Sequence, residues 1–181
     1  MEINSRLNHR YDAMKAIISY LENLNKPLNI VETGCIRILD NWEGDGQSTI
    51  LWDNLVNLTG GMVYSIDIDP IATSLTQSLV SDRVKVYTAD SISTLTELAL
   101  TDIKIDLLYL DSYDIDWDNP NLSMEHHLKE FKAAAGMLSK GSVVAVDDNI
   151  ILGKGYLIGL EAERLGYSTL IDSYIRAWIV E

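Results

Sequence analysis

The chain has 181 residues, of which 47% are hydrophobic and 23% are charged. This composition is typical of a globular protein with a full-sized core. The formal net charge is −13 and the basic residues are scattered, so a nucleic acid is excluded as the main partner because it would be repelled. No stretch approaches about 18 apolar residues, which argues against a membrane span. The N-terminus lacks a secretory signal pattern and Cys35 is the single cysteine, so we expect a cytoplasmic protein.

Residues 5–25 carry apolar side chains at helical spacing, which predicts an N-terminal helix that ends before Pro27. Five short apolar runs follow and suit strands buried on both faces: 28–33, 62–67, 84–89, 105–111 and 142–147. Segments long enough for crossover helices lie between them: 47–58, 71–81, 91–100 and 123–138. Strands that alternate with helices predict a parallel sheet with helices on both sides.

The end of the chain breaks this alternation. A predicted helix over 154–165 is followed by Gly166 and by two apolar runs, 167–172 and 175–180, with only two residues between them. This spacing predicts a hairpin, so one of its strands must be antiparallel. The predicted fold class is an α/β Rossmann-like three-layer sandwich with a mostly parallel seven-stranded sheet and a C-terminal antiparallel hairpin. We expect a single domain over 1–181, with an N-terminal helix (1–26) and a Rossmann-like core (27–181).

Acidic residues end each predicted parallel strand, where ligands bind in open sheets of this kind. They are Glu32, Asp67 with Asp69, Asp90, Asp111, and Asp147 with Asp148. Some of these acids would serve as helix caps, as Asp90 with Ser91 would. The adjacent pair Asp147 and Asp148 needs a cation or a buried donor to offset its repulsion. Asp67, with Asp69 in reserve, is placed to accept hydrogen bonds from a ribose diol.

The glycines after the first strand argue against a dinucleotide site. Gly34 is not followed by a second glycine at the G-x-G-x-x-G spacing, and Gly44 and Gly46 come later, in an acidic loop without a phosphate-binding lysine. Such a loop would repel phosphates but would suit a cofactor with a sulfonium and an amino group. The glycines could also simply form a turn before a helix that begins near Gln47.

These features resemble the class I S-adenosylmethionine-dependent methyltransferases, over nearly the whole chain from Leu28 to the terminal hairpin. Val31-Glu32-Thr33-Gly34 is similar to their cofactor motif, and Gly46-Gln47-Ser48-Thr49 looks like its continuation, displaced by an insertion over about 36–43. The resemblance implies that S-adenosylmethionine is the cofactor. It implies these cofactor-binding residues: Glu32, Thr33, Gly34, Gly46, Ser48, Thr49, Asp67, Asp69, Asp90, Ser91 and Asp111.

The later motifs resemble the metal-dependent O-methyltransferases, which include the catechol and the macrocin O-methyltransferases. The relevant residues are Asp111 after the fourth strand and the segment from Leu138-Ser139-Lys140-Gly141 to Asp147-Asp148. The resemblance implies that Asp111, Asp147 and Asp148 hold Mg²⁺ or a similar divalent cation. That cation would lower the pKa of an acceptor hydroxyl. We therefore expect methyl transfer to a hydroxyl of a small molecule or sugar.

The general base departs from the family pattern. The catechol enzymes carry a lysine three residues after the strand-four ligand, where this chain has Asp114. Our candidates for the catalytic base are Asp114, His126 and His127. Neighbouring helix positions point different ways, so at most one of the two histidines would be catalytic. Lys154 could meet an acidic group of the substrate or begin a solvent-facing helix.

Two other functions stay open from the sequence: a nicotinamide- or nucleotide-binding Rossmann oxidoreductase, and a non-catalytic binding module on the same fold. The broken glycine pattern and the terminal hairpin count against the oxidoreductase. We expect a small-molecule partner with a hydroxyl group, no nucleic acid and no membrane. The amphipathic N-terminal helix would either cover the pocket or pair with another subunit in a homodimer.

Overall fold

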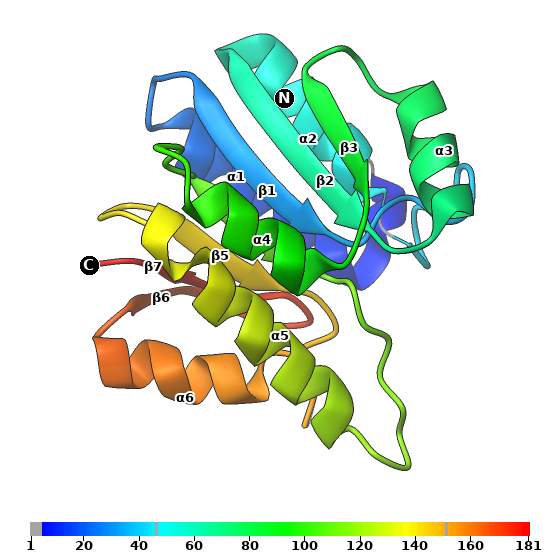
Figure 1. Cartoon of the computed structure of the whole chain (residues 1–181). Helices are drawn as coiled ribbons and strands as arrows, with labels where there is room; N and C mark the ends of the chain where they lie inside the picture. The colour runs from blue at the N-terminus through cyan, green and yellow to red at the C-terminus, as the bar shows by residue number, and fades with distance from the viewer. Residues whose placement is uncertain (1–4, 46, 151) are drawn as a thin grey trace.

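Seven strands form one sheet in the computed structural model, which describes residues 5–45, 47–150 and 152–181 (Figure 1). They are β1 (Leu28–Thr33), β2 (Gly61–Asp67), β3 (Val84–Thr88), β4 (Leu107–Leu110), β5 (Val143–Val146), β6 (Ser168–Asp172) and β7 (Arg176–Ile179). Their order is β3-β2-β1-β4-β5-β7-β6. The pairs among the first five strands are parallel, and β7 is antiparallel to both β5 and β6. The predicted mostly parallel sheet with a C-terminal hairpin is confirmed.

Helices cover both faces of this sheet. They are η1 (Ser5–Arg10), α1 (Tyr11–Glu22), α2 (Ser48–Thr59), α3 (Pro70–Leu79), α4 (Ser91–Ala99), α5 (Asn121–Ala134), η2 (Ala135–Met137) and α6 (Tyr156–Leu165). Alternate strand residues point to opposite faces, so β1 gives Leu28 and Ile30 to the core under α1 and α2. Val31 joins the other core, under α4, α5 and α6 (Figure 1).

Two segments differ from the sequence prediction. The N-terminal helix is interrupted, because Asn8 has φ 49° and ψ −121° inside η1. The last helix begins at Tyr156, so Lys154 lies in the loop between β5 and α6. Among the described residues, none of the helices combines the length and the apolar character that crossing a membrane requires.

Candidate active site

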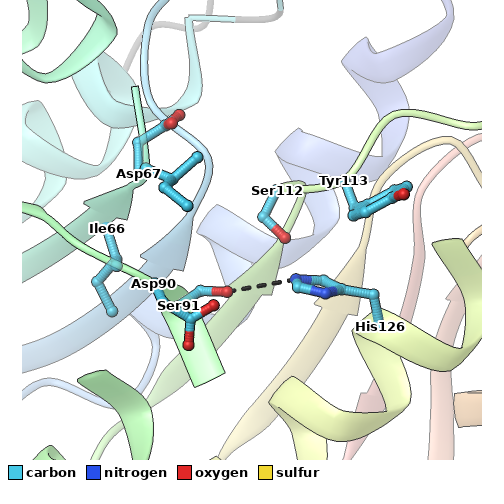
Figure 2. Close-up of a pocket in the computed structure, with 8 residues that line it drawn as sticks. Ile66, Asp67, Asp90, Ser91, Ser112, Tyr113 and His126 are labelled. Atoms are coloured by element: carbon cyan, nitrogen blue, oxygen red, sulfur yellow. Dashed lines mark hydrogen bonds between the residues drawn. The ribbon is translucent and has the colours of Figure 1, made fainter. Parts of the chain in front are cut away.

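Two adjoining cavities open where the parallel strands end. The first, of about 270 Å³, is lined by Ile66, Ile68, Asp90, Ser91, Tyr113 and His126 (Figure 2). The second, of about 210 Å³, is lined by Gly34, Cys35, Arg37, Asp45, Asp69 and Asp111. Asp67 and Ser112 line both, so we treat the two as one cofactor cleft. The cleft lies beyond the carboxyl ends of the strands, where ligands bind in open α/β sheets.

Asp67, at the end of β2, presents a carboxylate that the main chain orients. Its Oδ2 accepts the Cys35 N–H at 2.9 Å and its Oδ1 accepts the Asp69 N–H at 2.8 Å. A carboxylate has about four lone-pair sites, so acceptor capacity remains for a ribose diol. Asp69 also lines the cleft, but its exposed side chain caps α3 by accepting the Ile71 N–H at 2.8 Å.

Asp90 and Ser91 lie at the start of α4, on the wall of the first cavity. Asp90 accepts the Ser93 N–H at 2.8 Å, and this hydrogen bond lowers the pKa of the Asp90 carboxyl. The buried Ser91 hydroxyl lies 3.3 Å from His126 Nε2, as Figure 2 shows. Asp90 is therefore a helix cap, as the sequence indicates, and it also faces the cleft.

His126 on α5 is held by Glu130, which the sequence reasoning missed. His126 Nε2 lies 3.2 Å from Glu130 Oε1. Ser112 Oγ donates to the same oxygen at 2.7 Å, and Thr33 Oγ1 donates to Oε2 at 3.2 Å. Burial raises the pKa of Glu130, but the hydrogen bond with His126, the nearby His127 and the hydroxyls of Ser91 and Ser112 outweigh burial and leave this pKa below its ordinary value. The spacing of four residues between His126 and Glu130 was the available signal, since such positions share a helix face.

His127 points into the core instead. It is fully buried, and its Nδ1 donates to the Ser123 carbonyl at 2.7 Å. Its Nε2 has no hydrogen-bond partner within the described part of the chain. Burial lowers the pKa of His127 to about 4, so the ring is neutral near pH 7. The third candidate base, Asp114, is exposed and accepts from Arg37 Nη1 at 2.7 Å.

Glu32 is fully buried and its carboxylate is saturated by donors of this chain. Its Oε1 accepts from Ser48 Oγ at 2.5 Å and from Trp52 Nε1 at 3.1 Å. Its Oε2 accepts from Thr49 Oγ1 at 2.6 Å and from Ser65 Oγ at 2.9 Å. Burial raises the pKa of Glu32 to about 7, although the four donors favour the ionised form. These hydrogen bonds connect α2 to β1 and β2. Gly46, which the sequence analysis also assigns to the cofactor, lies outside the described residues.

Gly34 brings the ends of β1 and β4 together. Its φ is +92°, a region that favours glycine. A Cβ placed there would lie 2.6 Å from the Asp111 carbonyl oxygen. Only glycine therefore allows this close approach, which places Asp111 on the cleft wall.

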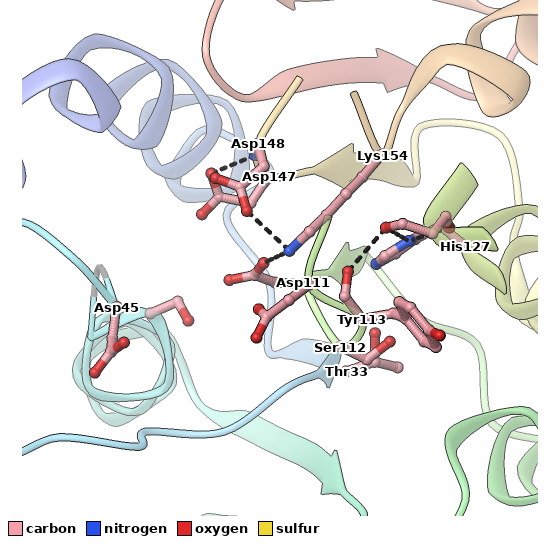
Figure 3. A network of polar contacts seen from close by, with 12 residues as sticks. Thr33, Asp45, Asp111, Ser112, Tyr113, His127, Asp147, Asp148 and Lys154 are labelled. Atoms are coloured by element: carbon pink, nitrogen blue, oxygen red, sulfur yellow. Dashed lines mark hydrogen bonds and ion pairs between the residues drawn. The ribbon is translucent and has the colours of Figure 1, made fainter. Parts of the chain in front are cut away.

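Asp111, Asp147 and Asp148 lie together after the neighbouring strands β4 and β5, with Lys154 among them (Figure 3). Arg10 is a second cation that contacts this cluster. Lys154 Nζ binds Asp111 Oδ1 and lies 3.0 Å from Asp148 Oδ2. The Lys154 side chain is only 1% exposed. Arg10 Nε donates to Asp147 Oδ2 at 2.8 Å, and its Nη2 lies 3.5 Å from Asp148 Oδ1.

The paired charges shift the ionisation of these groups. Burial lowers the pKa of Lys154, but the carboxylates of Asp111 and Asp148 outweigh burial and raise it above its ordinary value. Arg10 behaves in the same way beside Asp147. Burial raises the pKa of Asp111 against the attraction of Lys154. The cluster therefore contains two permanent cations, Arg10 and Lys154, and three carboxyl groups.

A divalent cation among the three predicted ligands does not fit this arrangement. Asp147 is 1% exposed and already accepts from Arg10, from Tyr109 Oη at 2.7 Å and from the Asp148 N–H at 2.7 Å. The Lys154 ammonium lies between the other two carboxylates, where Mg²⁺ would need oxygen ligands at about 2.0–2.1 Å. Across residues 5–45, 47–150 and 152–181, no three His, Cys, Asp or Glu side chains are arranged to hold a metal ion. The prediction of a metal site rested on the three acids and on the family resemblance, without the ion pairs that Arg10 and Lys154 form with these acids.

The N-terminal segment contacts the insertion after β1. Arg10 Nη1 donates to the Glu43 carbonyl at 2.7 Å, and Asn8 Nδ2 donates to Glu43 Oε1 at 2.9 Å. Arg6 adds an exposed ion pair with Asp40 at 2.9 Å. The segment therefore lies at the border of the site through Arg10, which bridges the insertion and the acid cluster.

The chain is similar to known methyltransferases in sequence and in fold. Residues 43–149 match a family described as a methyltransferase domain, and no curated protein matches the sequence. Among solved structures, the MycE methyltransferase of the mycinamycin pathway, in complex with Mg and SAH, is 13% identical, with a TM-score of 0.63 over 90% of this chain and 48% of MycE. The chain thus spans about half the length of MycE.

Two further structures share the fold. The calicheamicin methyltransferase CalS11 is 14% identical, with a TM-score of 0.66 over 95% of this chain and 80% of CalS11. The N-methyltransferase NodS from Bradyrhizobium japonicum is 12% identical, with a TM-score of 0.57 over 95% of this chain and 96% of NodS. Because an N-methyltransferase shares the fold, the acceptor atom has to be argued from the site residues.

Proposed function

The chain belongs to the class I S-adenosylmethionine-dependent methyltransferases, and we propose that its methyl acceptor is a hydroxyl group of a small molecule or sugar. The family membership favours methyl transfer over the nicotinamide-dependent alternative. The proposal concerns the acceptor and the residues that serve it.

The second cavity complements the amino-acid end of the cofactor in charge. Four carboxyl groups line it: Asp45, Asp67, Asp69 and Asp111. They suit the sulfonium and the ammonium group of S-adenosylmethionine. Arg37 is the one cation among the described lining residues, and its guanidinium suits the cofactor carboxylate. When bound, S-adenosylmethionine supplies an activated methyl group and leaves as a neutral thioether.

The position of Asp111 carries the proposal of a hydroxyl acceptor. A hydroxyl must lose its proton as its oxygen bonds to the methyl carbon, so it needs a proton acceptor and nearby positive charge. Asp111 lines the second cavity, and Lys154 lies directly behind its carboxylate. His126, which lines the first cavity, is the other candidate base. Comparing Asp111→Asn with His126→Asn separates them, since loss of the base lowers kcat more than cofactor affinity.

Sugars are the first acceptors to try. One CalS11 structure is described as a TDP-rhamnose 3′-O-methyltransferase, and a MycE structure contains Mg, SAH and mycinamycin VI. The net charge of −13 also makes a small-molecule acceptor more suitable than a nucleic acid. The divalent cation that the sequence predicts is tested by running each reaction with Mg²⁺ and with EDTA.

The test is a methyl-transfer assay that compares hydroxyl with amine acceptors. The purified chain is incubated with S-adenosylmethionine and a nucleoside-diphosphate deoxysugar, a catechol or a primary amine, and product mass and S-adenosylhomocysteine release are measured. We expect methylation of a hydroxyl acceptor that Asp67→Ala abolishes. Methylation of the amine alone would refute the proposal. S-adenosylhomocysteine binding without turnover on any acceptor would favour the non-catalytic binding module.

A further inference from the structure

Lys154 is a buried lysine that the sequence pattern does not explain. Its side chain is 1% exposed and its ammonium contacts Asp111 and Asp148, which follow two adjacent parallel strands. Figure 3 shows the side chain reaching from the loop after β5 to these two carboxylates. A buried ammonium is stable only when carboxylates or other acceptors replace its water. The contact therefore belongs to the fold of the site and is not a chance surface ion pair.

The loop between β5 and α6 packs closely against the end of β5 and so positions Lys154 next to the acid cluster. A Cβ at Gly153 would lie 2.2 Å from the Asp148 carbonyl oxygen, and a Cβ at Gly155 would lie 2.8 Å from Asn149 Oδ1. Gly153 therefore has to be glycine, because the atoms it would meet are backbone, whereas a side chain at Gly155 would only displace the Asn149 side chain. Glycine at position 153 lets the loop fold closely over the end of β5. This packing holds Lys154 against the acid pair.

The remaining carboxylate is neutralised from another part of the chain. Asp147 is bound by Arg10, which contributes the second cation, and by the Tyr109 hydroxyl. With Arg10 and Lys154 in place, each of the three carboxyl groups has a cation of this chain within 3.5 Å, and these ion pairs offset the repulsion among them. A divalent ion placed between Asp111 and Asp148 would meet the ammonium at close range and be repelled.

We propose that Lys154 is a built-in cation, which occupies the place that the resemblance to metal-dependent O-methyltransferases assigns to a divalent ion. Lys154 acts as a positioning residue: it holds the Asp111 carboxylate on the cleft wall and supplies the positive charge behind it. Its consequence for catalysis rests on the proposed hydroxyl methylation. Methyl transfer by this chain then needs no added metal.

Metal binding tests this proposal without any turnover. Mn²⁺ is titrated into the folded protein, and bound Mn²⁺ is measured as the loss of the free-ion paramagnetic resonance signal. The variants are Lys154→Ala, which removes the ammonium and leaves space for a hydrated ion, and Lys140→Ala as the control. Lys140 is 82% exposed and lies 3.8 Å from Glu181, away from the acid cluster. Each protein is also titrated with S-adenosylhomocysteine.

We expect no stoichiometric Mn²⁺ binding by the wild type or by Lys140→Ala. Lys154→Ala should bind one Mn²⁺ at least about tenfold more tightly than the wild type does, because the ion then replaces the lost positive charge of the lysine. The additional change Asp148→Asn should remove this binding. Wild-type activity should be unchanged by EDTA, and Mg²⁺ should partly restore activity to Lys154→Ala.

Stoichiometric Mn²⁺ binding by the wild type, or loss of its activity in EDTA, would overturn the proposal. A folded Lys154→Ala that gains no Mn²⁺ affinity would overturn it as well. If Lys154→Ala does not fold, the wild-type titration decides, together with Lys154→Met/Asp148→Asn, in which one charge of each sign is removed. This double variant should stay folded and bind no metal. Failure of S-adenosylhomocysteine binding would count against the proposed function and leave the metal result to be judged separately.

Discussion

Replacing Gly34 by alanine should test the close contact that places Asp111 in the cleft. Gly34 combines a positive φ of 92° with a Cβ position 2.6 Å from the Asp111 carbonyl oxygen and 2.9 Å from its carbonyl carbon. A left-handed conformation costs a non-glycine residue about 1–2 kcal/mol. Overlap with backbone that cannot rotate away adds about 1–3 kcal/mol. The free energy of unfolding should therefore fall by roughly 2–5 kcal/mol.

Two other glycines separate these contributions. Gly166 has φ +75° with nothing within 4 Å of a Cβ, so Gly166→Ala should lose only about 1–2 kcal/mol, the conformational part. Gly136 has neither a positive φ nor a neighbour within 4 Å, so Gly136→Ala should change stability by less than about 1 kcal/mol.

Unfolding in urea is monitored by tryptophan fluorescence, because the buried Trp52 and Trp178 become exposed to water when the chain unfolds. S-adenosylhomocysteine affinity is measured by calorimetry on the same proteins. Gly34→Ala alone should lose cofactor affinity, because Asp111 must move. If Gly34→Ala is no less stable than Gly166→Ala and binds the ligand as the wild type does, the close contact between β1 and β4 is refuted.

Three further perturbations follow from single residues. Burial lowers the pKa of His127 to about 4 in the folded protein, whereas the unfolded chain has the ordinary value of about 6.5. Between these values the unfolded chain binds more protons than the folded one. The free energy of unfolding should therefore fall by up to about 3 kcal/mol as the pH drops from about 6.5 to 4. His127→Asn keeps a donor for the Ser123 carbonyl and should flatten this pH dependence in urea unfolding; an unchanged slope would contradict the assignment. Asp67→Ala should weaken S-adenosylhomocysteine binding by about 2–4 kcal/mol in calorimetry, because charged hydrogen bonds to the ribose are lost; unaltered affinity would exclude Asp67 from the ribose site. Asp53 accepts from the Ser81 N–H at 2.8 Å and from its hydroxyl, so Asp53→Ala should lower the free energy of unfolding by about 1–3 kcal/mol at constant ligand affinity.

The strand order along the chain was readable from the sequence, but the place of the last strand was not. Apolar runs and their spacing predicted five parallel strands and a hairpin, because strands buried on both faces need continuous apolar residues. The insertion of β7 between β5 and β6 is a tertiary choice. It depends on the pairing of Val144 with Trp178, and the two runs of the hairpin look alike in hydrophobicity.

Some residues of the site were likewise predictable from the sequence, and others were not. Asp67, Asp90, Ser91 and Asp111 were identifiable because residues that end parallel strands meet at one edge of the sheet, and all four line the cleft. His126 could not be distinguished from His127 by residue type, and helix geometry only required that the two point different ways. Which one faces the cleft depends on how α5 packs against β4.

The sequence by itself determined the fold class, the methyltransferase resemblance and the gathering of acids at the strand ends, because these follow from local periodicity and chain order. Only the tertiary structure decided what neutralises those acids. Arg10 and Asp147 are 137 positions apart in the chain, and Lys154 reaches Asp111 across 43 positions. No local pattern encodes such pairs, since they form only when the core has packed and removed water from the charges. The same three carboxylates that suggest a metal site in the sequence are therefore bound by the chain's own cations in the folded protein.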